Sequence, residues 1–375
     1  MCRKILLLLL ILNFYGYAAW QSAFAAETNV KISSSSLSSG LVSKGSFIWG
    51  INGHPLGGAG VYTEDRGVSL AQQFGLVKEL GFTWYRFDVF AVEPNDELDT
   101  IVPPAEKAGI KLYPTLHPPI ELRPYTTLPS RFDNNDVYKK CFEHARSVAG
   151  KWRGRIKVWD LSNEPDGWVI KDERHGNKRE DYEPNLVAVA AAILKGQSDG
   201  IKAGDPDAKV SLNTGGWLHY GFVDLMIENG INFDILSWHW YNEMGDIDCI
   251  KKMENFNLLK ELKKYDKPIW LGEYNYRPKK DKKAGYDPVD NAWLLETIQR
   301  LYSYRNNGVE AVFIYELLDF PSDDIGSGYY GLVGVDRKPG MDGKEIFVIT
   351  ERKPIYYEIQ SWLTSLKVFQ IHQKN

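Results

Sequence analysis

Two glutamates in this sequence stand where acid–base chemistry could take place. Glu164 follows the apolar run Val158–Leu161 in VWDLSNEP, and Glu273 follows IWLG and precedes Tyr-Asn-Tyr. Each stands where a buried strand is expected to end. Two carboxyl groups facing each other across one bond, one donating a proton and the other acting as nucleophile or base, are what cleavage of a glycosidic bond requires. Alternatively, Glu164 is a surface acid capping a loop before Pro165, and Glu273 is half of a salt bridge at the rim of the fold.

Eight apolar runs, rich in β-branched and aromatic residues, recur along the chain after about Ser46. They are FIWGI (47–51), FTWYRF (82–87), IKLYPTL (110–116), IKVWDL (156–161), KVSLN (209–213), FDILSWHW (233–240), KPIWLGE (267–273) and VEAVFIYEL (309–317). Short runs that are apolar throughout are typical of parallel strands covered on both faces.

Helical patterns separate most of these runs. Apolar residues recur at helical spacing before a glycine in three segments: 70–77 before Gly81, 186–194 before Gly204, and 294–302 before Gly308. A glycine after the last periodic residue, followed by a strand, is the pattern of a helix-to-strand turn. We also expect a short helix around Pro104 to Ala108 and a final helix over Pro354 to Leu366.

Strands and helices that alternate eight times predict a (β/α)8 TIM barrel, for which about 250 residues plus loop insertions are typical. The predicted catalytic domain covers residues 45–370. An open, doubly wound sheet is the alternative, and it usually carries a glycine-rich nucleotide turn after its first strand. Gly-Gly-Ala-Gly at 57–60 neither follows that strand directly nor opens a helix, so we interpret it as a loop.

Polar residues gather at the predicted strand ends, while the strand bodies stay apolar. In a barrel, active-site side chains come from the carboxyl ends of several strands. The residues at these ends are His54, Arg86, Asp88, His117, Asn163, Glu164, His239, Tyr241, Glu273, Glu316 and Asp319. Strands four and seven are three places apart around an eight-stranded ring, so we expect Glu164 and Glu273 to converge on one bound sugar.

The Asn163-Glu164-Pro165 step at the end of strand four, with Glu273 at the end of strand seven, resembles glycoside hydrolase clan A, the retaining (β/α)8 hydrolases. The resemblance covers nearly the whole mature chain. The tail GYYGLVGVD, followed by Arg-Lys-Pro at 352–354, is similar to the clan's C-terminal pattern. Within the clan, the chain looks closest to family 39-like enzymes, including secreted bacterial endoglycosidases that act on exopolysaccharide, with family 5-like enzymes as near neighbours.

The resemblance implies a role for each matching residue. Glu164 would be the acid/base and Glu273 the nucleophile. Arg86 matches the clan's arginine near the nucleophile, and it would keep Glu273 ionised together with a hydrogen bond from Tyr241. Asn163 would hydrogen-bond the sugar 2-OH, although an Asx turn is the structural alternative.

Other candidates have a structural alternative of similar weight. Arg86 and Asp88 lie on the same face of their strand, so Arg86 could pair with Asp88 or with another barrel carboxylate. His239 matches the clan's histidine after strand six, but His239 and His117 could each be a histidine satisfied within the core. Tyr315 stands where many clan members have a tryptophan that floors the sugar site, and Ser162 also replaces a common tryptophan.

The chain has 12 tryptophans. Aromatic faces stack on sugar rings, but tryptophan is also an ordinary core residue. Trp168, Trp217 and Trp240 fall in or beside loops at the expected active face, and we expect one or two of them to form sugar-binding platforms. Trp49, Trp159 and Trp270 lie within strands and are expected in the core.

The N-terminus has the pattern of a secretory signal peptide over residues 1–25: Arg3 and Lys4, a short apolar core, and Ala-Phe-Ala at 23–25. A serine-rich, disordered lead-in over 26–44 follows, and the predicted location is secreted or periplasmic. Removing residues 1–25 takes away two positive charges, so 45 − 2 = 43 basic residues oppose 49 acidic ones and the mature net charge is −6. This charge argues against a nucleic-acid partner. Cys141 and Cys249 could be paired or free.

The predicted function is a retaining glycosidase that cleaves β-linkages within an oligo- or polysaccharide, acting as a monomer without cofactor or metal. The endo preference rests on the resemblance and on the long loops 118–134 and 166–183. The lysine-rich run 279–283 is interpreted as a solvated surface, with contact to an anionic polysaccharide as a minor hypothesis. Two competing functions are a secreted carbohydrate-binding barrel without catalysis and a metal-dependent barrel hydrolase, which would typically carry His-x-His on its first strand, where only His54 stands.

Overall fold

The computed structural model describes residues 47–55, 67–90, 97–120, 133–276, 288–320 and 329–372, and for 288–292 and 367–372 it describes the backbone alone. Several predicted features lie outside these residues: the signal segment 1–25, the lead-in 26–44, the glycine loop 57–60, most of the loop 118–134 and the lysine run 279–283.

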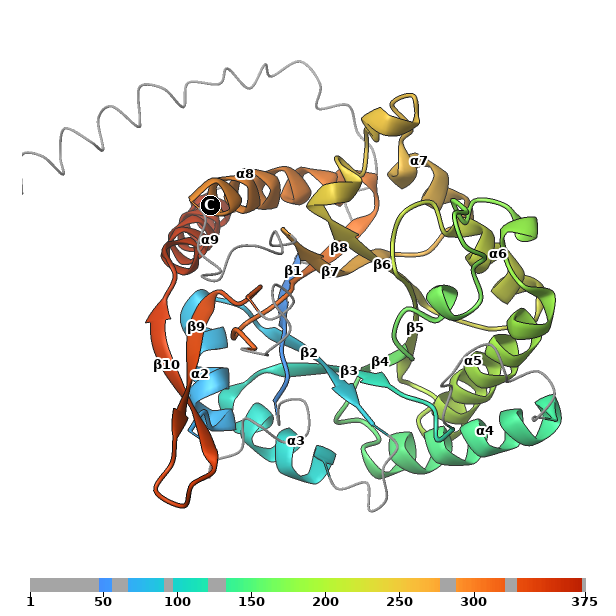
Figure 1. Ribbon diagram of the computed structural model, residues 1–375, viewed down its shortest axis with the longest axis horizontal. Coiled ribbons are helices and arrows are strands. Elements are labelled where there is room, and N and C mark those ends of the chain that lie inside the picture. The colour runs from blue at the N-terminus through green and yellow to red at the C-terminus, as the bar shows by residue number, and fades with distance from the viewer. Residues whose placement is uncertain are drawn as a thin grey trace, which may run out of the picture. The chain divides into compact units, whose positions relative to one another are not determined.

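Eight parallel strands form a closed barrel in sequence order. The strands are β1 (Ile48–Asn52), β2 (Trp84–Val89), β3 (Lys111–Leu116), β4 (Val158–Leu161), β5 (Lys209–Thr214), β6 (Ile235–Tyr241), β7 (Ile269–Asn275) and β8 (Val309–Ile314). The ring closes because β1 pairs with β8 through Ile48 and Ala311, which confirms the barrel and makes the open-sheet alternative wrong. Figure 1 looks into the ring, with the helices outside it.

Helices follow the strands around the ring. They are α2 (Leu70–Leu80), α3 (Glu97–Ala108), α4 (Asn134–Lys151), α5 (Pro184–Gly204), α6 (Tyr220–Glu228), α7 (Leu258–Leu262), α8 (Pro288–Ser303) and α9 (Pro354–His372). In the part of the chain that the structure describes, no helix is both long and apolar enough to cross a membrane.

The ends of α2 follow from local chemistry. The Ser69 hydroxyl accepts a hydrogen bond from the Gln72 backbone N–H (3.2 Å), and the Gln72 side chain accepts one from the Ser69 N–H (2.9 Å). This capping box satisfies two backbone donors at the start of the helix. At the other end, Gly81 adopts φ 86°, a left-handed conformation that glycine enters without steric cost, and the helix stops as predicted.

The start of α3 differs from the prediction, which placed it near Pro104. The helix begins at Glu97 and contains Pro103 and Pro104. A first-turn position is where proline is best tolerated, so the prolines indicated a later start. The buried stripe of Leu98, Ile101, Val102 and Ala105 has helical spacing and packs as one face, and this packing outweighs the prolines.

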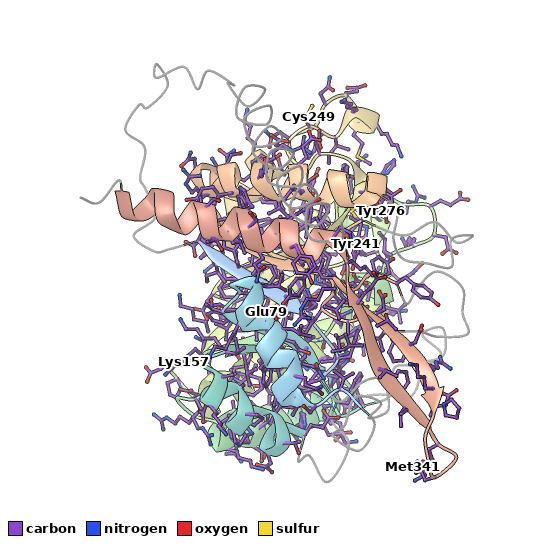
Figure 2. The ribbon with its side chains drawn as sticks, turned by 90° about the vertical axis from the view of Figure 1, so that its left-hand side faces the viewer. Glu79, Lys157, Tyr241, Cys249, Tyr276 and Met341 are labelled. Atoms are coloured by element: carbon purple, nitrogen blue, oxygen red, sulfur yellow. The ribbon has the colours of Figure 1, made fainter. Side chains whose placement is uncertain are left out.

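A two-stranded antiparallel sheet, β9 (Val333–Pro339) and β10 (Glu345–Arg352), was not predicted. Most of its residues are at least partly exposed, so it lacks the apolar pattern of the barrel strands. Figure 2 shows the barrel from the side: Lys157, before β4, lies at one end, whereas Tyr241 and Tyr276, at the ends of β6 and β7, lie at the other. The hairpin projects from this second side to its tip at Met341.

Aromatic side chains fill the barrel interior. Trp84 and Trp270 meet edge to face with ring centroids 5.5 Å apart, and Trp270 lies 5.7 Å from Phe313. Gly50 makes room for them, because a Cβ there would lie 2.3 Å from the Phe313 ring. Burial of Trp49 (8% exposed), Trp159 (0%) and Trp270 (4%) confirms the prediction that these tryptophans lie in the core.

Helices α4 and α5 approach each other closely along a row of glycines in α5. A Cβ on Gly196 would lie 2.5 Å from the Tyr138 carbonyl oxygen, and a Cβ on Gly200 would lie 2.4 Å from that of Phe142. Both distances are shorter than any real Cβ contact, so a side chain at either position would force the helices apart.

Gly200→Ala is therefore expected to lower the free energy of unfolding by about 1–3 kcal/mol, the usual cost of overpacking. The matched control is Gly75→Ala in α2, where nothing lies within 4 Å of the added Cβ. This control should raise stability by roughly 0.5–1 kcal/mol, because alanine is the better helix former. Urea unfolding measures both changes, and a Gly200→Ala variant as stable as the wild type would contradict the close packing.

Candidate active site

The turn after β4 places Glu164 at the mouth of the barrel. Ser162 and Glu164 both adopt left-handed backbone conformations, with φ 55° and 45°. The Asn213 side chain from β5 holds this turn: its Oδ1 accepts from the Glu164 backbone N–H (2.8 Å), and its Nδ2 donates to the Ser162 carbonyl (2.8 Å). Sequence reasoning did not single out Asn213, although an asparagine ending an apolar strand was a usable signal.

Glu273 lies near the end of β7 and is 7% exposed. Arg86 Nη1 donates to its Oε1 (2.8 Å), and the Tyr241 hydroxyl donates to its Oε2 (2.6 Å). These are the two contacts that the clan resemblance implied. Tyr241 reaches Glu273 because β6 and β7 are adjacent strands, with His239 opposite Glu273 and Tyr241 opposite Asn275.

The two glutamates converge, and one nitrogen of His239 contacts both of them. His239 Nδ1 lies 2.8 Å from Glu164 Oε1 and 3.5 Å from Glu273 Oε1. One oxygen of each carboxylate and one His239 nitrogen all lie within 4.8 Å of one another. Carboxyl groups about 5–5.5 Å apart are characteristic of retaining glycosidases, whereas inverting enzymes need about 6.5–9.5 Å to admit a water.

Arg86 is buried (3% exposed) and serves several partners. Besides Glu273, it donates from Nη1 to Asn52 Oδ1 (2.9 Å) and from Nη2 to Asn163 Oδ1 (2.9 Å). Its Nε donates to Asp160 Oδ2 (3.1 Å). The fixed Asn163 oxygen leaves the amide NH2 of that residue as a donor for a further partner.

The ion pair suggested between Arg86 and Asp88 is wrong, because Asp88 instead pairs with His117 Nε2 at 2.8 Å. The alternative, that Arg86 pairs with another barrel carboxylate, is confirmed: Arg86 pairs with Asp160, which is fully buried. Asp160 was missed by the sequence analysis, although a single acid inside the apolar run IKVWDL indicates a buried ion pair.

Charge and burial shift the pKa values around Glu273. Burial alone would raise the pKa of Glu273, but the charges of His239 and Arg86 and the hydrogen bond from Tyr241 lower it below the ordinary 4.5. Burial opposes protonation of His239, yet Glu273 and Glu164 raise its pKa. Burial and the charge of Glu273 raise the pKa of Tyr241 well above 10.0, so its hydroxyl stays a donor.

A second polar group borders the site on the side of β1, β3 and β8. His54 Nε2 lies 2.8 Å from Glu316 Oε2, and although burial acts the other way, Glu316 raises the pKa of His54 to about 9. Burial would raise the pKa of Asp88, but its contact with His117 lowers it to about 2. The half-buried Tyr315 ring lies between these groups and Tyr241, with ring centroids 6.2 Å from His54 and 6.3 Å from Tyr241.

The three candidate platform tryptophans differ in exposure. Trp240 is fully buried and its Nε1 donates to the Gly245 carbonyl (2.7 Å), so its prediction as a sugar platform is wrong. Side chains alternate along a strand, and Trp240 therefore points away from the face that carries His239. Trp168 and Trp217 are both half-buried and both pack against the core, and Trp217 also lines a cavity of about 890 Å³.

Among the described residues, Glu164, His239 and Glu273 form a group whose carboxylate oxygens and imidazole nitrogen could together hold a metal ion. His239 Nδ1 lies 2.8 Å from Glu164 Oε1, and a proton on this nitrogen lets it donate to the ionised Glu164 carboxylate.

Cys141 and Cys249 are both free thiols.

No family model and no curated protein sequence matches the chain. Solved structures do match in fold. A family 1 β-glucosidase from Thermotoga maritima has a TM-score of 0.55 and 16% identity, covering 85% of this chain and 97% of its own. Xylanase 10B from Thermotoga petrophila RKU-1, in complex with xylobiose, has 0.56 and 16%, covering 85% and 94%. Virulence factor SghA, with its substrate analog salicin, has 0.56 and 15%, covering 84% and 95%. At this identity the similarity establishes the barrel fold.

Tyr241→Phe is expected to raise the pKa of Glu273, because it removes a hydrogen bond that stabilises the ionised carboxylate. Protonation of Glu273 then occurs at higher pH than in the wild type. NMR titration of the protein carrying 13C-labelled glutamate measures this shift, with Glu273→Gln to assign the signal.

Tyr274→Phe is the matched control for this substitution. Tyr274 is the next residue on β7, but its ring stacks on Trp293, with centroids 5.7 Å apart, and its hydroxyl interacts with Thr297. Its removal should leave the Glu273 titration unchanged. Equal titration curves for the wild type and Tyr241→Phe would contradict the assigned hydrogen bond.

Proposed function

We propose that this protein is a retaining β-glycosidase in which Glu273 is the nucleophile and Glu164 is the acid/base. The observation that carries the proposal is the approach of one oxygen of each carboxylate to within 4.8 Å, with His239 Nδ1 in contact with both. This spacing suits direct attack by one carboxylate on a sugar carbon. The similarity in fold to a β-glucosidase and a xylanase supports the same reaction class.

The environment of each carboxylate suits its proposed role. Glu273 is buried beside Arg86 and Tyr241, and its lowered pKa keeps it ionised for attack. The Glu164 side chain is 40% exposed, which leaves space for a leaving group and then for water. His239 Nδ1 donates to the Glu164 carboxylate that forms when the proton has left.

The reaction follows in two steps. Glu273 attacks the anomeric carbon, the bond to the leaving oxygen breaks, and Glu164 transfers its proton to that oxygen. A water molecule then attacks the anomeric carbon of the glycosyl ester, Glu164 takes a proton from the water, and Glu273 departs as a carboxylate. Two inversions give net retention. Asn163 offers its NH2 group to the sugar, and the Tyr315 ring lies beside the nucleophile where it can contact the glycone.

We further infer that the protein acts on a polysaccharide outside the cytoplasm. The signal-like segment 1–25 supports export, and the resemblance to family 39-like enzymes supports an exopolysaccharide. The described loop 166–183, with short helices at Pro165–Trp168 and Arg179–Asp181, builds one wall beside Glu164.

Glu164→Gln and Glu273→Gln are each expected to lower turnover by several powers of ten, since general acid–base assistance alone contributes about 10²–10⁴-fold. The measurement is a panel of polysaccharides with product sizing. Glu183→Gln is the control, because Glu183 is an exposed glutamate in the same loop.

Azide separates the two roles. It should restore activity to Glu164→Ala on an aryl glycoside with retained configuration in the glycosyl azide, and to Glu273→Ala with inverted configuration. Near-normal turnover in either Gln variant would rule out its role. Loss of wild-type activity with a chelator would favour a metal-dependent hydrolase, and no activity on any substrate would favour a binding barrel.

A further inference from the structure

A cavity of about 890 Å³ is lined by residues from the loops after β4, β5 and β6, and Glu164 lies near the start of the first of these loops. Its size is within the range of about 300–1,000 Å³ typical of small-molecule sites. The lining residues are Glu173, Arg174, His175, Asn177, Trp217, His219, Lys252, Met253 and Glu254. None of them comes from β7 or β8, so the cavity lies on the Glu164 side of the carboxylate pair.

Two glycines connect this cavity to the acid/base. A Cβ on Gly215 would lie 3.3 Å from the Glu164 carboxyl carbon, so the chain passes directly over that side chain. A Cβ on Gly216 would lie 2.4 Å from the His239 carbonyl oxygen. Trp217 is the next residue. The backbone of this segment therefore brings Trp217 to the side of Glu164 where the leaving group of the substrate would lie.

Asp166 holds the β4 and β5 loops together at this point. Its carboxylate is fully buried, and both of its oxygens accept from the same Gly215 N–H in a bifurcated hydrogen bond (2.9 and 3.0 Å). Its Oδ2 also contacts His219 Nδ1. Asp166 is two residues after Glu164, so one carboxylate sets the position of the cavity wall relative to the acid/base.

The cavity wall is also conformationally restricted. Glu173, Trp217 and Glu254 adopt left-handed backbone angles, with φ 58°, 45° and 55°. Such angles are unfavourable for non-glycine residues, and they persist where the surrounding structure imposes them. The Trp217 backbone N–H donates to Met244 Sδ (3.5 Å), which helps to hold the ring at the cavity.

The charges in the cavity balance. Arg174 and Lys252 are opposed by Glu173 and Glu254, and the other polar lining residues are one asparagine and two histidines. An aromatic ring with mixed hydrogen-bonding groups and equal numbers of basic and acidic side chains suits a neutral sugar better than a polyanion.

We propose that this cavity binds a neutral sugar unit on the leaving-group side of the cleaved bond, with Trp217 as its stacking platform. The proposal rests on the proposed glycosidase function, and it makes the protein an enzyme that cuts within a chain. A sugar held there can also replace water in the second step: its hydroxyl attacks the anomeric carbon, Glu164 takes the hydroxyl proton, and the bond to Glu273 breaks.

The test uses the full-length chain carrying Glu273→Gln, so that binding can be measured without turnover. Neutral cello-, xylo- and laminari-oligosaccharides are titrated by calorimetry at low and high ionic strength. Adding Trp217→Ala should weaken binding at least about tenfold, as expected for an aromatic residue at the centre of a binding site. Trp217→Phe should retain most of the affinity, and affinity should not depend on salt.

Tyr357→Ala is the control, because Tyr357 is an exposed aromatic residue (52%) on α9 and should not affect binding. Equal affinity with and without Trp217→Ala, or no binding of any of the three oligosaccharide series, would overturn the proposal. A steep loss of affinity with salt would overturn the neutral ligand. Failure of the proposed function looks different, because either the wild type would show no turnover or Glu273→Gln would keep it, whatever Trp217 binds.

Discussion

The buried guanidinium of Arg86 is the interaction on which the site depends. Removing a charge from water costs several kcal/mol unless it is paired and hydrogen-bonded. Here the partners come from separate strands: Asn52 from β1, Asp160 within β4 and Asn163 just beyond it, and Glu273 from β7. Satisfying one charge therefore joins opposite sides of the barrel mouth. The same contacts orient the proposed nucleophile and the amide beside it.

The turn after β4 plays the complementary part for the acid/base. The left-handed angles of Ser162 and Glu164 are maintained by Asn213, which replaces the backbone partners that the turn lacks. Asp166 then fixes the next loop in the same way through Gly215. Hydrogen bonds thus connect Glu164 to the loop that lines the cavity, whereas the position of Glu273 is set by its contacts with Arg86. His239 is the contact between the two.

The local signals in the sequence were strong for the barrel and weaker elsewhere. All eight apolar runs became strands, because a strand buried on both faces must be apolar throughout. The β9–β10 hairpin was not predicted because most of its residues are at least partly exposed and need not be apolar. The start of α3 was misplaced because local rules for Pro104 competed with a buried stripe that only packing could favour. Trp240 was misassigned, although alternation from His239 would have placed it on the opposite face.

The sequence by itself determined the barrel, the strand ends and the two glutamates that stand on them, because periodicity, glycine stops and the Asn163-Glu164-Pro165 step are local features. Only the tertiary structure decided which groups meet. Glu164 and Glu273 are 273 − 164 = 109 residues apart, and their approach depends on strand register and barrel closure rather than on either segment. Tertiary packing also decided that Arg86 pairs with Asp160 on a different strand rather than with Asp88 on its own strand. Side chains distant in sequence come within hydrogen-bonding reach only after packing has set the distances between strands.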